Sequence, residues 1–359
     1  MNLLLGFLAV AIAVAVFGYG AARPTPAESA VAGSNNGRGG DSVNAPVTPP
    51  LLRLSDGERV LTLVGTIHSV PSRYRAAEGA QLPMELYDDI EAADLILVES
   101  NLLTLRPLER LLQSAEVRRV YMEADAEAGR PSLSAYLKSR NESLPTEFAE
   151  SLFERLDDVH EQRLEALFDL RPWAARDRLN RLRRRADEYD WGPGLDEYIV
   201  RAAEQAGTSV KHLETWEELA ALMDEADQEY YVDELLFSVM GDIPEDEIVQ
   251  ARQAHSRRVL EYWSRDELET IMASPYDELD REVPPELQRG RRREIEMLLE
   301  TRERAWAQEL LSILEETGAE RVLVAVGAAH VRGDDTVFPE LLQEAGFTPV
   351  SETLDRLQR

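Results

Sequence analysis

A short motif containing a glycine and a histidine occurs twice in this chain, about 260 residues apart. TLVGTIH (residues 62–68) and VAVGAAH (residues 324–330) each consist of an apolar run, a glycine, two small or apolar residues and a histidine. The chain has 5 histidines, so the motif accounts for two of them. Imidazole acts both as a general base near neutral pH and as a metal ligand. The repeated motif therefore predicts functional roles for His68 and His330.

Two glutamates also follow apolar runs. Glu99 ends LILVE and Glu214 ends VKHLE. Ligands of α/β proteins bind beyond the carboxyl ends of the strands, so we expect both glutamates and both motif histidines at one edge of a sheet. Imidazole and carboxylate together suit a divalent ion such as Mn, Fe, Co or Zn. Each residue alone also has an ordinary structural explanation, as a hydrogen-bonded histidine or a helix-capping glutamate.

Composition narrows the possible chemistry. The chain has no cysteine, which excludes disulfides, thiolate metal sites and a cysteine nucleophile. Its 39 Lys and Arg against 68 Asp and Glu give a net charge of −29. Non-specific nucleic-acid binding needs a basic surface, so we expect no nucleic-acid partner. Any metal must be held by histidines and carboxylates.

The elements that would position these residues alternate along the chain. LLRL and RVLTLV flank Ser55-Asp56-Gly57-Glu58, which predicts a β-hairpin. Short apolar runs and helical patterns then alternate at both ends of the body, which favours an α/β fold with a mixed, largely parallel sheet. The central segments are charged and helical in pattern, and we expect them to cover the sheet. The predicted strands are residues 93–100, 208–214, 321–326 and 347–350, and the predicted helices are 83–93, 196–207, 299–318 and most of 102–190 and 215–300.

The order of these motifs resembles the TraB/GumN family, which is related to the Tiki proteases. GTIHSVP, LILVESN, GPGLDEYI, VKHLET, ETRERAWAQ and VAVGAAHVRG carry the resemblance, which covers most of residues 51–350. It implies a metal-dependent hydrolase, and in the Tiki branch a membrane-tethered, Mn- or Co-dependent peptidase that cuts near substrate N-termini. It also implies that His68, Glu99 and His330 are the core site residues and the metal ligands.

The same resemblance implies support or substrate-binding roles for Asp196, Glu214 and Arg302. This sequence departs from the family pattern in two places. Asn101 stands where a second carboxylate is commoner, although its side chain can still supply an oxygen. TRERAW (residues 301–306) also lacks the asparagine that often accompanies the helix arginine.

The predicted mechanism uses a water molecule activated by the metal ion, with a glutamate moving the proton. Glu99 and Glu214 are both candidates for the general base, and the sequence does not decide between them. Arg302 is expected to hold a substrate carboxylate or the developing oxyanion, or alternatively to form a surface ion pair.

The N-terminal residues predict a membrane or export segment. Residues 1–22 contain no charged side chain and are long enough to span a bilayer, so they form either a signal peptide or an anchor. The missing basic n-region favours the anchor. Residues 23–50 read as a flexible linker, and residues 51–359 as the folded body. We expect a membrane-anchored or exported protein, on the periplasmic or extracellular face.

Two oppositely charged runs lie in the helical middle. Residues 171–185 hold seven arginines and one aspartate, and residues 224–247 hold ten acidic residues and no basic one. We interpret them as helices that face water or each other. The alternatives are a charged lid over the strand ends, or contact of the basic run with anionic lipid.

The leading interpretation is a hydrolase with a peptide or protein substrate. A first rival is a metal-independent ester or amide hydrolase in which a motif histidine is the general base, as in the related erythromycin esterases. A second rival is a non-catalytic protein that binds a peptide or haem. A chelator inhibits only the metal-dependent enzyme, and the binding protein shows no turnover.

Overall fold

The structure is a computed structural model of the full chain. The predicted anchor, residues 1–22, and all but the last residues of the predicted linker lie outside its described part. Within the described part, no helix combines the length and apolarity needed to cross a membrane. The described residues are 49–71, 84–101, 122–156, 161–184, 191–263, 283–332 and 336–350.

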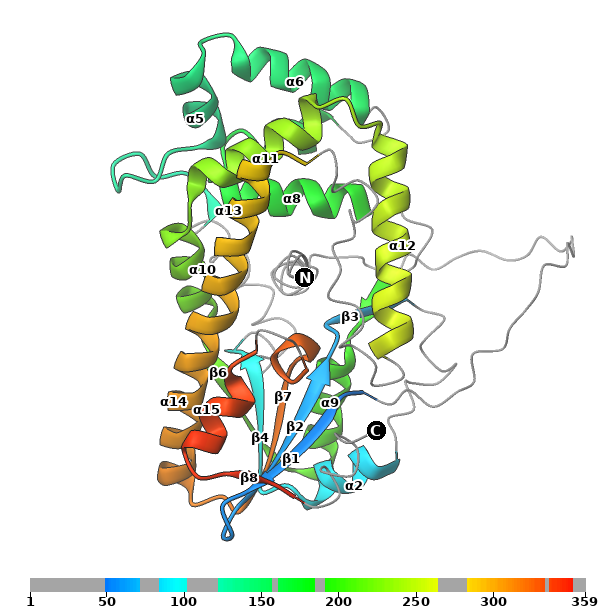
Figure 1. Ribbon diagram of the computed structural model, residues 1–359, viewed down its shortest axis with the longest axis vertical. Helices are drawn as coiled ribbons and strands as arrows, with labels where there is room; N and C mark the ends of the chain where they lie inside the picture. Colours follow the sequence, from blue (N-terminus) through cyan, green and yellow to red (C-terminus); the bar gives the residue numbers. More distant parts are fainter. Residues whose placement is uncertain are drawn as a thin grey trace, which may run out of the picture.

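A six-stranded sheet forms the base of the molecule (Figure 1). Its first four strands in spatial order are parallel, and β1 pairs antiparallel with both β2 and β8. The predicted mixed, largely parallel sheet, built from the N- and C-terminal parts of the body, is confirmed. The spatial order is β6 (Ser209–Glu214), β4 (Leu95–Ser100), β7 (Arg321–Gly327), β2 (Val60–Thr66), β1 (Leu51–Ser55) and β8 (Thr348–Pro349).

The predicted hairpin joins β1 and β2. Ser55 pairs with Val60, and Gly57 between them adopts a φ of +95°, a conformation that favours glycine. Asp56 Oδ1 accepts hydrogen bonds from the backbone N–H groups of Glu58 and Arg59. The turn and the register follow from these local interactions.

Both faces of the sheet are covered by helices. Helices α2 (Met84–Ala92) and α9 (Leu195–Ala206) pack on one face, and α14 (Arg302–Thr317) and α15 (Phe338–Glu344) pack on the other. Side chains alternate between the faces along each strand, so β7 sends Val324 to the second face and Leu323 to the first. Burial on both faces explains why these strands read as continuous apolar runs.

The helical middle has hydrophobic cores of its own. Figure 1 shows α5, α6, α8 and α11 beyond the carboxyl ends of the parallel strands, joined to the sheet region by two long helical segments. One is α12, and the other is α13 continued through a π-helical turn, Met297–Thr301, into α14. The helices are α5 (Leu133–Arg140), α6 (Leu144–Arg155), α7 (Glu161–Glu165), α8 (Pro172–Arg184), α10 (Trp216–Glu225), α11 (Gln228–Met240), α12 (Glu245–Trp263) and α13 (Pro285–Glu296).

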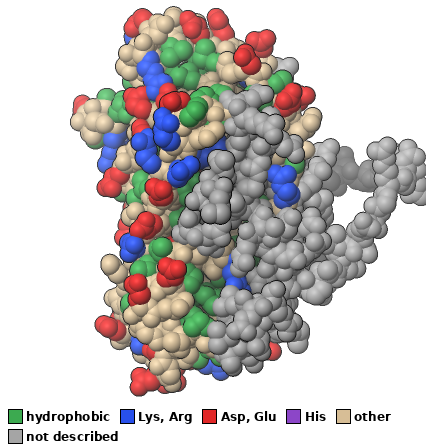
Figure 2. Space-filling view, viewed as in Figure 1, with side chains coloured by type: hydrophobic (Ala, Val, Ile, Leu, Met, Phe, Trp, Pro, Cys, Tyr) green, Lys and Arg blue, Asp and Glu red, His purple; other side chains and the backbone are tan. Residues whose placement is uncertain are grey.

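The two charged runs of the middle pair with each other. Arg176 Nη1 lies 2.9 Å from Glu234 Oε2, and Arg183 Nε lies 2.6 Å from Glu245 Oε1. Arg171 pairs with Asp224 in the same way. The interpretation that the runs face each other is confirmed for these pairs. On the described surface, Figure 2 shows acidic and basic side chains interspersed.

One element of the fold was not predicted. β3 (Ser69–Pro71) pairs antiparallel with β5 (Trp191–Pro193) in a two-stranded sheet. This pairing joins the chain directly after His68 to the chain directly before α9.

Candidate functional site

Each of the four predicted site residues lies at the carboxyl end of a parallel strand. His68 lies two residues beyond β2, and His330 ends a short 3₁₀ turn, Ala328–His330, that follows β7. Glu99 is the next-to-last residue of β4, and Glu214 is the last of β6. Because these strands are neighbours in the sheet, their ends meet at one edge.

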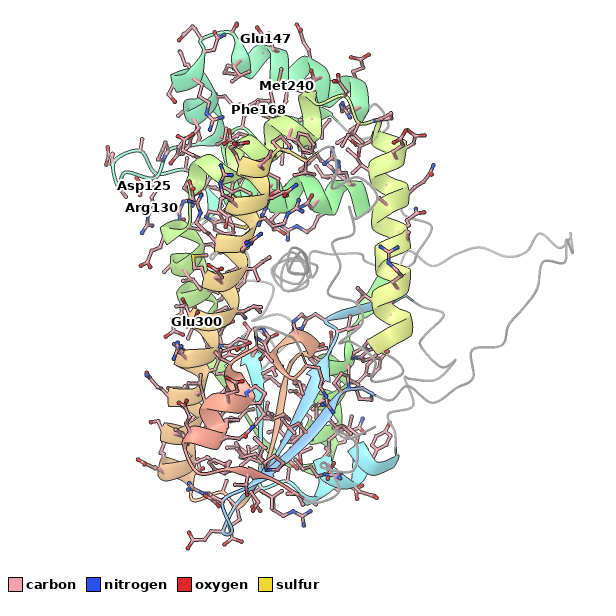
Figure 3. The ribbon with its side chains drawn as sticks, viewed as in Figure 1. Asp125, Arg130, Glu147, Phe168, Met240 and Glu300 are labelled. Atoms are coloured by element: carbon pink, nitrogen blue, oxygen red, sulfur yellow. The ribbon has the colours of Figure 1, made fainter. Side chains whose placement is uncertain are left out.

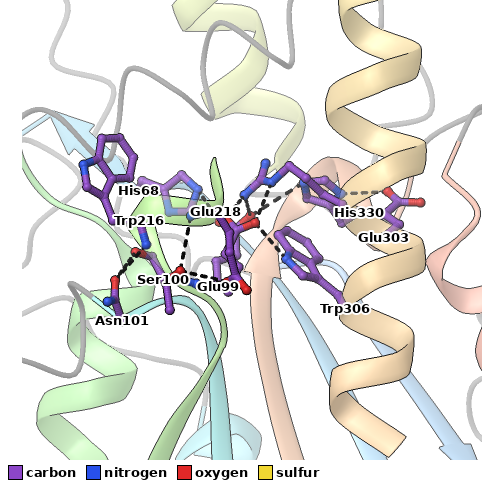
Figure 4. Close-up of polar contacts among 12 residues, drawn as sticks. His68, Glu99, Ser100, Asn101, Trp216, Glu218, Glu303, Trp306 and His330 are labelled. Atoms are coloured by element: carbon purple, nitrogen blue, oxygen red, sulfur yellow. Dashed lines mark hydrogen bonds and ion pairs between the residues drawn. The ribbon is translucent and has the colours of Figure 1, made fainter. Parts of the chain in front are cut away.

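Glu99 is the centre of the cluster and is 1% exposed (Figure 4). Its Oε2 lies 2.7 Å from His68 Nε2, and its Oε1 lies 3.6 Å from His330 Nε2. Arg302 Nη2 donates a hydrogen bond of 3.2 Å to the same Oε1. Both motif histidines therefore turn the same ring nitrogen toward one carboxylate.

The other ring nitrogen of His68 is held by Asp196. Nδ1 lies 2.9 Å from Asp196 Oδ2, at the start of α9. This helix begins directly against the backbone of the first motif, where the Leu195 N–H donates to the Ile67 carbonyl at 3.0 Å. A Cβ on Gly194 would lie 2.1 Å from that carbonyl oxygen, so only glycine permits this approach.

His330 has an equivalent partner that sequence analysis did not identify. Its Nδ1 lies 2.7 Å from Glu303 Oε1, and both side chains are completely buried. The helical spacing of the sequence could have identified Glu303. It lies three and seven residues before Trp306 and Leu310, so it shares with them the face of α14 that packs in the core. A charged residue on an apolar face needs a buried partner.

Glu214 is engaged by two donors from α14. Arg302 binds it through both Nε and Nη2, at 3.0 and 2.5 Å, and Trp306 Nε1 donates to it at 3.0 Å. The guanidinium carbon of Arg302 also lies 4.5 Å from the centroid of the Trp306 ring. Arg302 is 3% exposed, so the alternative of a surface ion pair is wrong.

Asn101 takes a structural position beside the cluster. Its Oδ1 accepts a hydrogen bond of 3.0 Å from the backbone N–H of Trp216, the first residue of α10. The side chain thereby ties the end of β4 to the start of α10.

The central charges shift two pKa values in opposite directions. Burial lowers the pKa of His68, but the charges of Glu99 and Asp196 outweigh it and raise this pKa to about 10. Burial raises the pKa of Glu99, but His68 outweighs it, with help from Arg302 and His330, and lowers this pKa to about 2. At neutral pH His68 and Glu99 therefore form an ion pair.

The chemistry of the donor set fits a divalent metal ion. His68 Nε2, His330 Nε2 and Glu99 Oε2 are buried and have no hydrogen bond of regular geometry among the described residues. A carboxylate on the other ring nitrogen is the usual way in which proteins orient a metal-binding histidine. Asp196 and Glu303 supply that carboxylate to the two rings.

The donors as they stand are too close together to hold an ion. Among the described side chains, no three or more His, Asp or Glu are arranged so that they could hold one. His68 Nε2 and Glu99 Oε2 are 2.7 Å apart, whereas two ligands of one tetrahedral zinc ion lie about 3.4 Å apart. Metal binding would require these two groups to separate slightly.

The fold and the site define an α/β protein with a buried histidine–carboxylate cluster at the carboxyl edge of its sheet. The chain belongs to the TraB/PrgY/gumN family, whose family model matches residues 50–351. Neither a curated protein nor a solved structure matches the chain. The resemblance expected from the motifs is thereby confirmed at the level of the family.

Proposed function

We propose that this protein is a metal-dependent hydrolase that cleaves peptides or proteins. The observation that supports it best is the pair of buried imidazoles, each fixed by a carboxylate at Nδ1 and each turning Nε2 toward Glu99. His68, His330 and Glu99 would hold the ion, and Mn or Co is proposed, with Zn or Fe as further candidates.

The excess of buried carboxylates at the site supports the binding of a cation there. Four carboxylates gather there, from Glu99, Asp196, Glu214 and Glu303, and all are buried. Among the described side chains, Arg302 is the one arginine in contact with them at the cluster. Counting Arg302 and the protonated His68 ring, the carboxylates outnumber the positive charges by two, and buried charge is costly unless it is balanced. A divalent ion would offset most of this excess.

A bound ion would supply a Lewis acid and an activated water. The remaining roles, proton transfer and substrate binding, would fall to the side chains of the cluster. Both oxygens of Glu214 accept hydrogen bonds from Arg302 or Trp306, whereas Glu99 Oε2 has the His68 imidazole as its partner, at 2.7 Å. Glu99 is therefore the carboxylate placed to exchange a proton, because its partner is an imidazole, which can release one, and not a guanidinium.

Arg302 is suited to bind a substrate oxygen. Its Nη1 is buried and has no hydrogen-bond partner in the described part of the chain, while Nε and Nη2 are fixed on Glu214 and Glu99. A donor held in place by its neighbours stabilises a developing oxyanion without reorganising. Arg302 would polarise the scissile carbonyl or hold a substrate carboxylate.

The proposal includes a location outside the cytoplasm. Residues 1–22 are uncharged and almost wholly apolar, which supports export or anchoring at the membrane. A peptide substrate on the periplasmic or extracellular face would then meet the enzyme there.

The test uses the full chain, loaded separately with Mn, Co and Zn. Metal content and cleavage of a peptide library are measured with and without chelator, for the wild type, His68→Ala and His330→Ala. His212→Ala is the matched control, because this histidine lies on β6 and is partly exposed. We expect both site variants to lose metal and cleavage and the control to keep them. Wild-type metal content and cleavage in both site variants would refute the proposal.

A metal-independent hydrolase is the second candidate. The observation that favours it is the contact of His68 Nδ1 with Asp196, which would orient the ring of a general base. Hydrolysis that persists in chelator, and that is lost in Asp196→Asn, would identify this mechanism instead.

A further inference from the structure

Gly65, the glycine of the first motif, lies opposite Pro50, the residue that precedes β1. The register that pairs Leu51 with Val64 continues by one residue at this point. The Gly65 N–H donates to the Pro50 carbonyl at 2.8 Å, as expected for two residues that face each other in an antiparallel pair. Pro50 has no N–H and cannot return the bond, so the Gly65 carbonyl needs a donor from another element.

Trp263, the last residue of α12, supplies that donor. Its Nε1 donates a buried hydrogen bond of 2.9 Å to the Gly65 carbonyl, and the side chain is 3% exposed. The other end of α12 is also fixed, because both carboxylate oxygens of its first residue, Glu245, accept from Arg183 of α8 at 2.6 and 2.7 Å. The indole is therefore carried by a helix that is held at both ends.

Each residue from Gly65 to the residue before His68 is bound by a different element. Gly65 is bound by α12. The Thr66 hydroxyl donates to the Val326 carbonyl of β7 at 3.1 Å, and the Ile67 carbonyl accepts from the first backbone N–H of α9 at 3.0 Å. The bond from the indole is thus the first of three that fix the path of the chain to His68.

Gly65 also sets the distance between the two motifs. A Cβ on Gly65 would lie 2.9 Å from Ala328 Cα, which belongs to the second motif and is two residues before His330. Trp263 and Ala328 belong to the same hydrophobic cluster. The backbones of the motifs therefore meet at this glycine, and a shift of Gly65 would change the spacing of the two histidines.

We infer that Trp263 is a positioning residue: its indole replaces the hydrogen bond that Pro50 cannot make, and so holds the first motif against the second. Only the consequence for metal binding rests on the proposed function. The hydrogen bond itself belongs to the metal-free protein.

Two tryptophan variants make the same chemical change in different places. Trp263→Phe keeps an aromatic ring but removes the donor to Gly65. Trp173→Phe is the matched control, because Trp173 is also buried and its Nε1 donates to Asp224 at 2.9 Å in the helical middle. Adding Pro50→Ala to Trp263→Phe restores a backbone N–H opposite the Gly65 carbonyl, and so separates loss of the donor from loss of ring size.

The first readout is hydrogen exchange of the backbone N–H groups of residues 64–68, measured by mass spectrometry on the metal-free full-length protein. We expect about tenfold faster exchange in Trp263→Phe, because a local opening no longer has to break this bond. Trp173→Phe should keep the wild-type rate in this segment, and the added Pro50→Ala should restore it. Replacement of Trp263 by benzothienylalanine, which has the same shape without the N–H, gives the same test if Trp263→Phe does not fold.

Three results would each overturn the inference. They are wild-type exchange in Trp263→Phe, an equal acceleration of this segment in Trp173→Phe, and no recovery when Pro50→Ala is added.

The second readout is the affinity for Mn and Co, measured by titration calorimetry. We expect about a tenfold loss in Trp263→Phe, recovery with Pro50→Ala, and wild-type affinity in Trp173→Phe. Wild-type affinity in Trp263→Phe would overturn the positioning role. A wild type that binds neither ion would instead refute the proposed function, and the exchange rates would then decide the inference alone.

Discussion

The helical middle and the sheet edge contain the same motif, a buried arginine stacked on an aromatic ring and bound by two glutamates. Among the described side chains, histidines join this motif at the sheet edge alone. In the helical middle, Arg176 lies 4.4 Å from the ring centroid of Tyr231. Glu294 binds its two terminal nitrogens at 2.5 and 2.8 Å, and Glu234 binds one of them at 2.9 Å.

At the sheet edge, Arg302 stacks on Trp306, is bound through two nitrogens by Glu214 and touches Glu99. The difference lies in the second glutamate. Glu99 also faces two imidazoles. A buried arginine–glutamate cluster is therefore not in itself evidence of a functional site.

The two clusters differ in what their carboxylates have left to bind. Both oxygens of Glu294 accept hydrogen bonds from Arg176, and together with Glu234 the cluster joins α8, α11 and α13. Glu99 is equally buried, but its Oε2 lies 2.7 Å from the His68 imidazole, a partner that can release its proton. Carboxylates bound by a guanidinium alone specify packing, whereas a carboxylate between two oriented imidazoles is available for chemistry.

The largest expected effect is that of Glu99→Gln on activity. The amide is neither a base nor an anionic ligand, so kcat/KM should fall by about a hundred- to ten-thousandfold. Steady-state kinetics on a peptide that the wild type cleaves measures this, and thermal unfolding shows that the variant folds. A loss below tenfold would place the chemistry elsewhere.

Glu294→Gln should have the opposite effect, a large loss of stability with little change in kcat/KM. Removing one partner of a buried ion pair leaves Arg176 without its full counter-charge, which costs about 3–5 kcal/mol of unfolding free energy. Urea denaturation measures the loss, and kcat/KM of the folded fraction should stay near the wild-type value. A specific loss of activity without loss of stability would mean that the two clusters are not functionally different.

The next largest effect concerns the His68–Glu99 ion pair of the sheet edge, which should make the unfolding free energy depend on pH. His68 has a folded pKa of about 10 against an ordinary value of 6.5. Its ion pair therefore stabilises the metal-free fold fully below about pH 6.5, and this contribution disappears as pH rises through 10. Glu99 has a folded pKa of about 2 against an ordinary value of 4.5, so its contribution is fully present above about pH 4.5 and is lost as pH falls from there through 2.

Urea denaturation of the wild type and His68→Gln across this range tests the prediction. The wild type should be more stable by about 2 kcal/mol near pH 6, and the gap should close toward pH 10. A gap that is constant with pH would contradict the ion pair.

The smallest effect is expected at Glu300. Figure 3 labels this exposed residue of the π-helical turn. It pairs with Arg304 at 2.7 Å and is two residues from buried Arg302 in the sequence. Glu300→Gln should change the unfolding free energy by about 0.3–0.5 kcal/mol, less at high salt. Thermal unfolding at two salt concentrations provides the measurement, and a loss above 2 kcal/mol would show that the turn itself depends on this pair.

Local sequence determined the strands, the hairpin and the helices next to the sheet. The apolar runs of β4 and β7 need burial on both faces, and Asp56-Gly57 favours one tight turn wherever it occurs. The repeated glycine–histidine motif likewise predicted that His68 and His330 follow strands, because the motif includes the apolar run that forms each strand. These predictions use interactions between residues close in the sequence.

The tertiary structure alone decided which partners complete the site. Glu303 and His330 are 27 residues apart, His68 and Asp196 are 128 apart, and neither pairing leaves a local pattern. The same is true of Arg176, whose helix carries several arginines that are alike in the sequence. A buried charge needs a counter-charge, but the fold selects which one by the close packing of distant segments. The sequence thus determined which histidines and glutamates follow the strands, and the packing determined their partners and orientation.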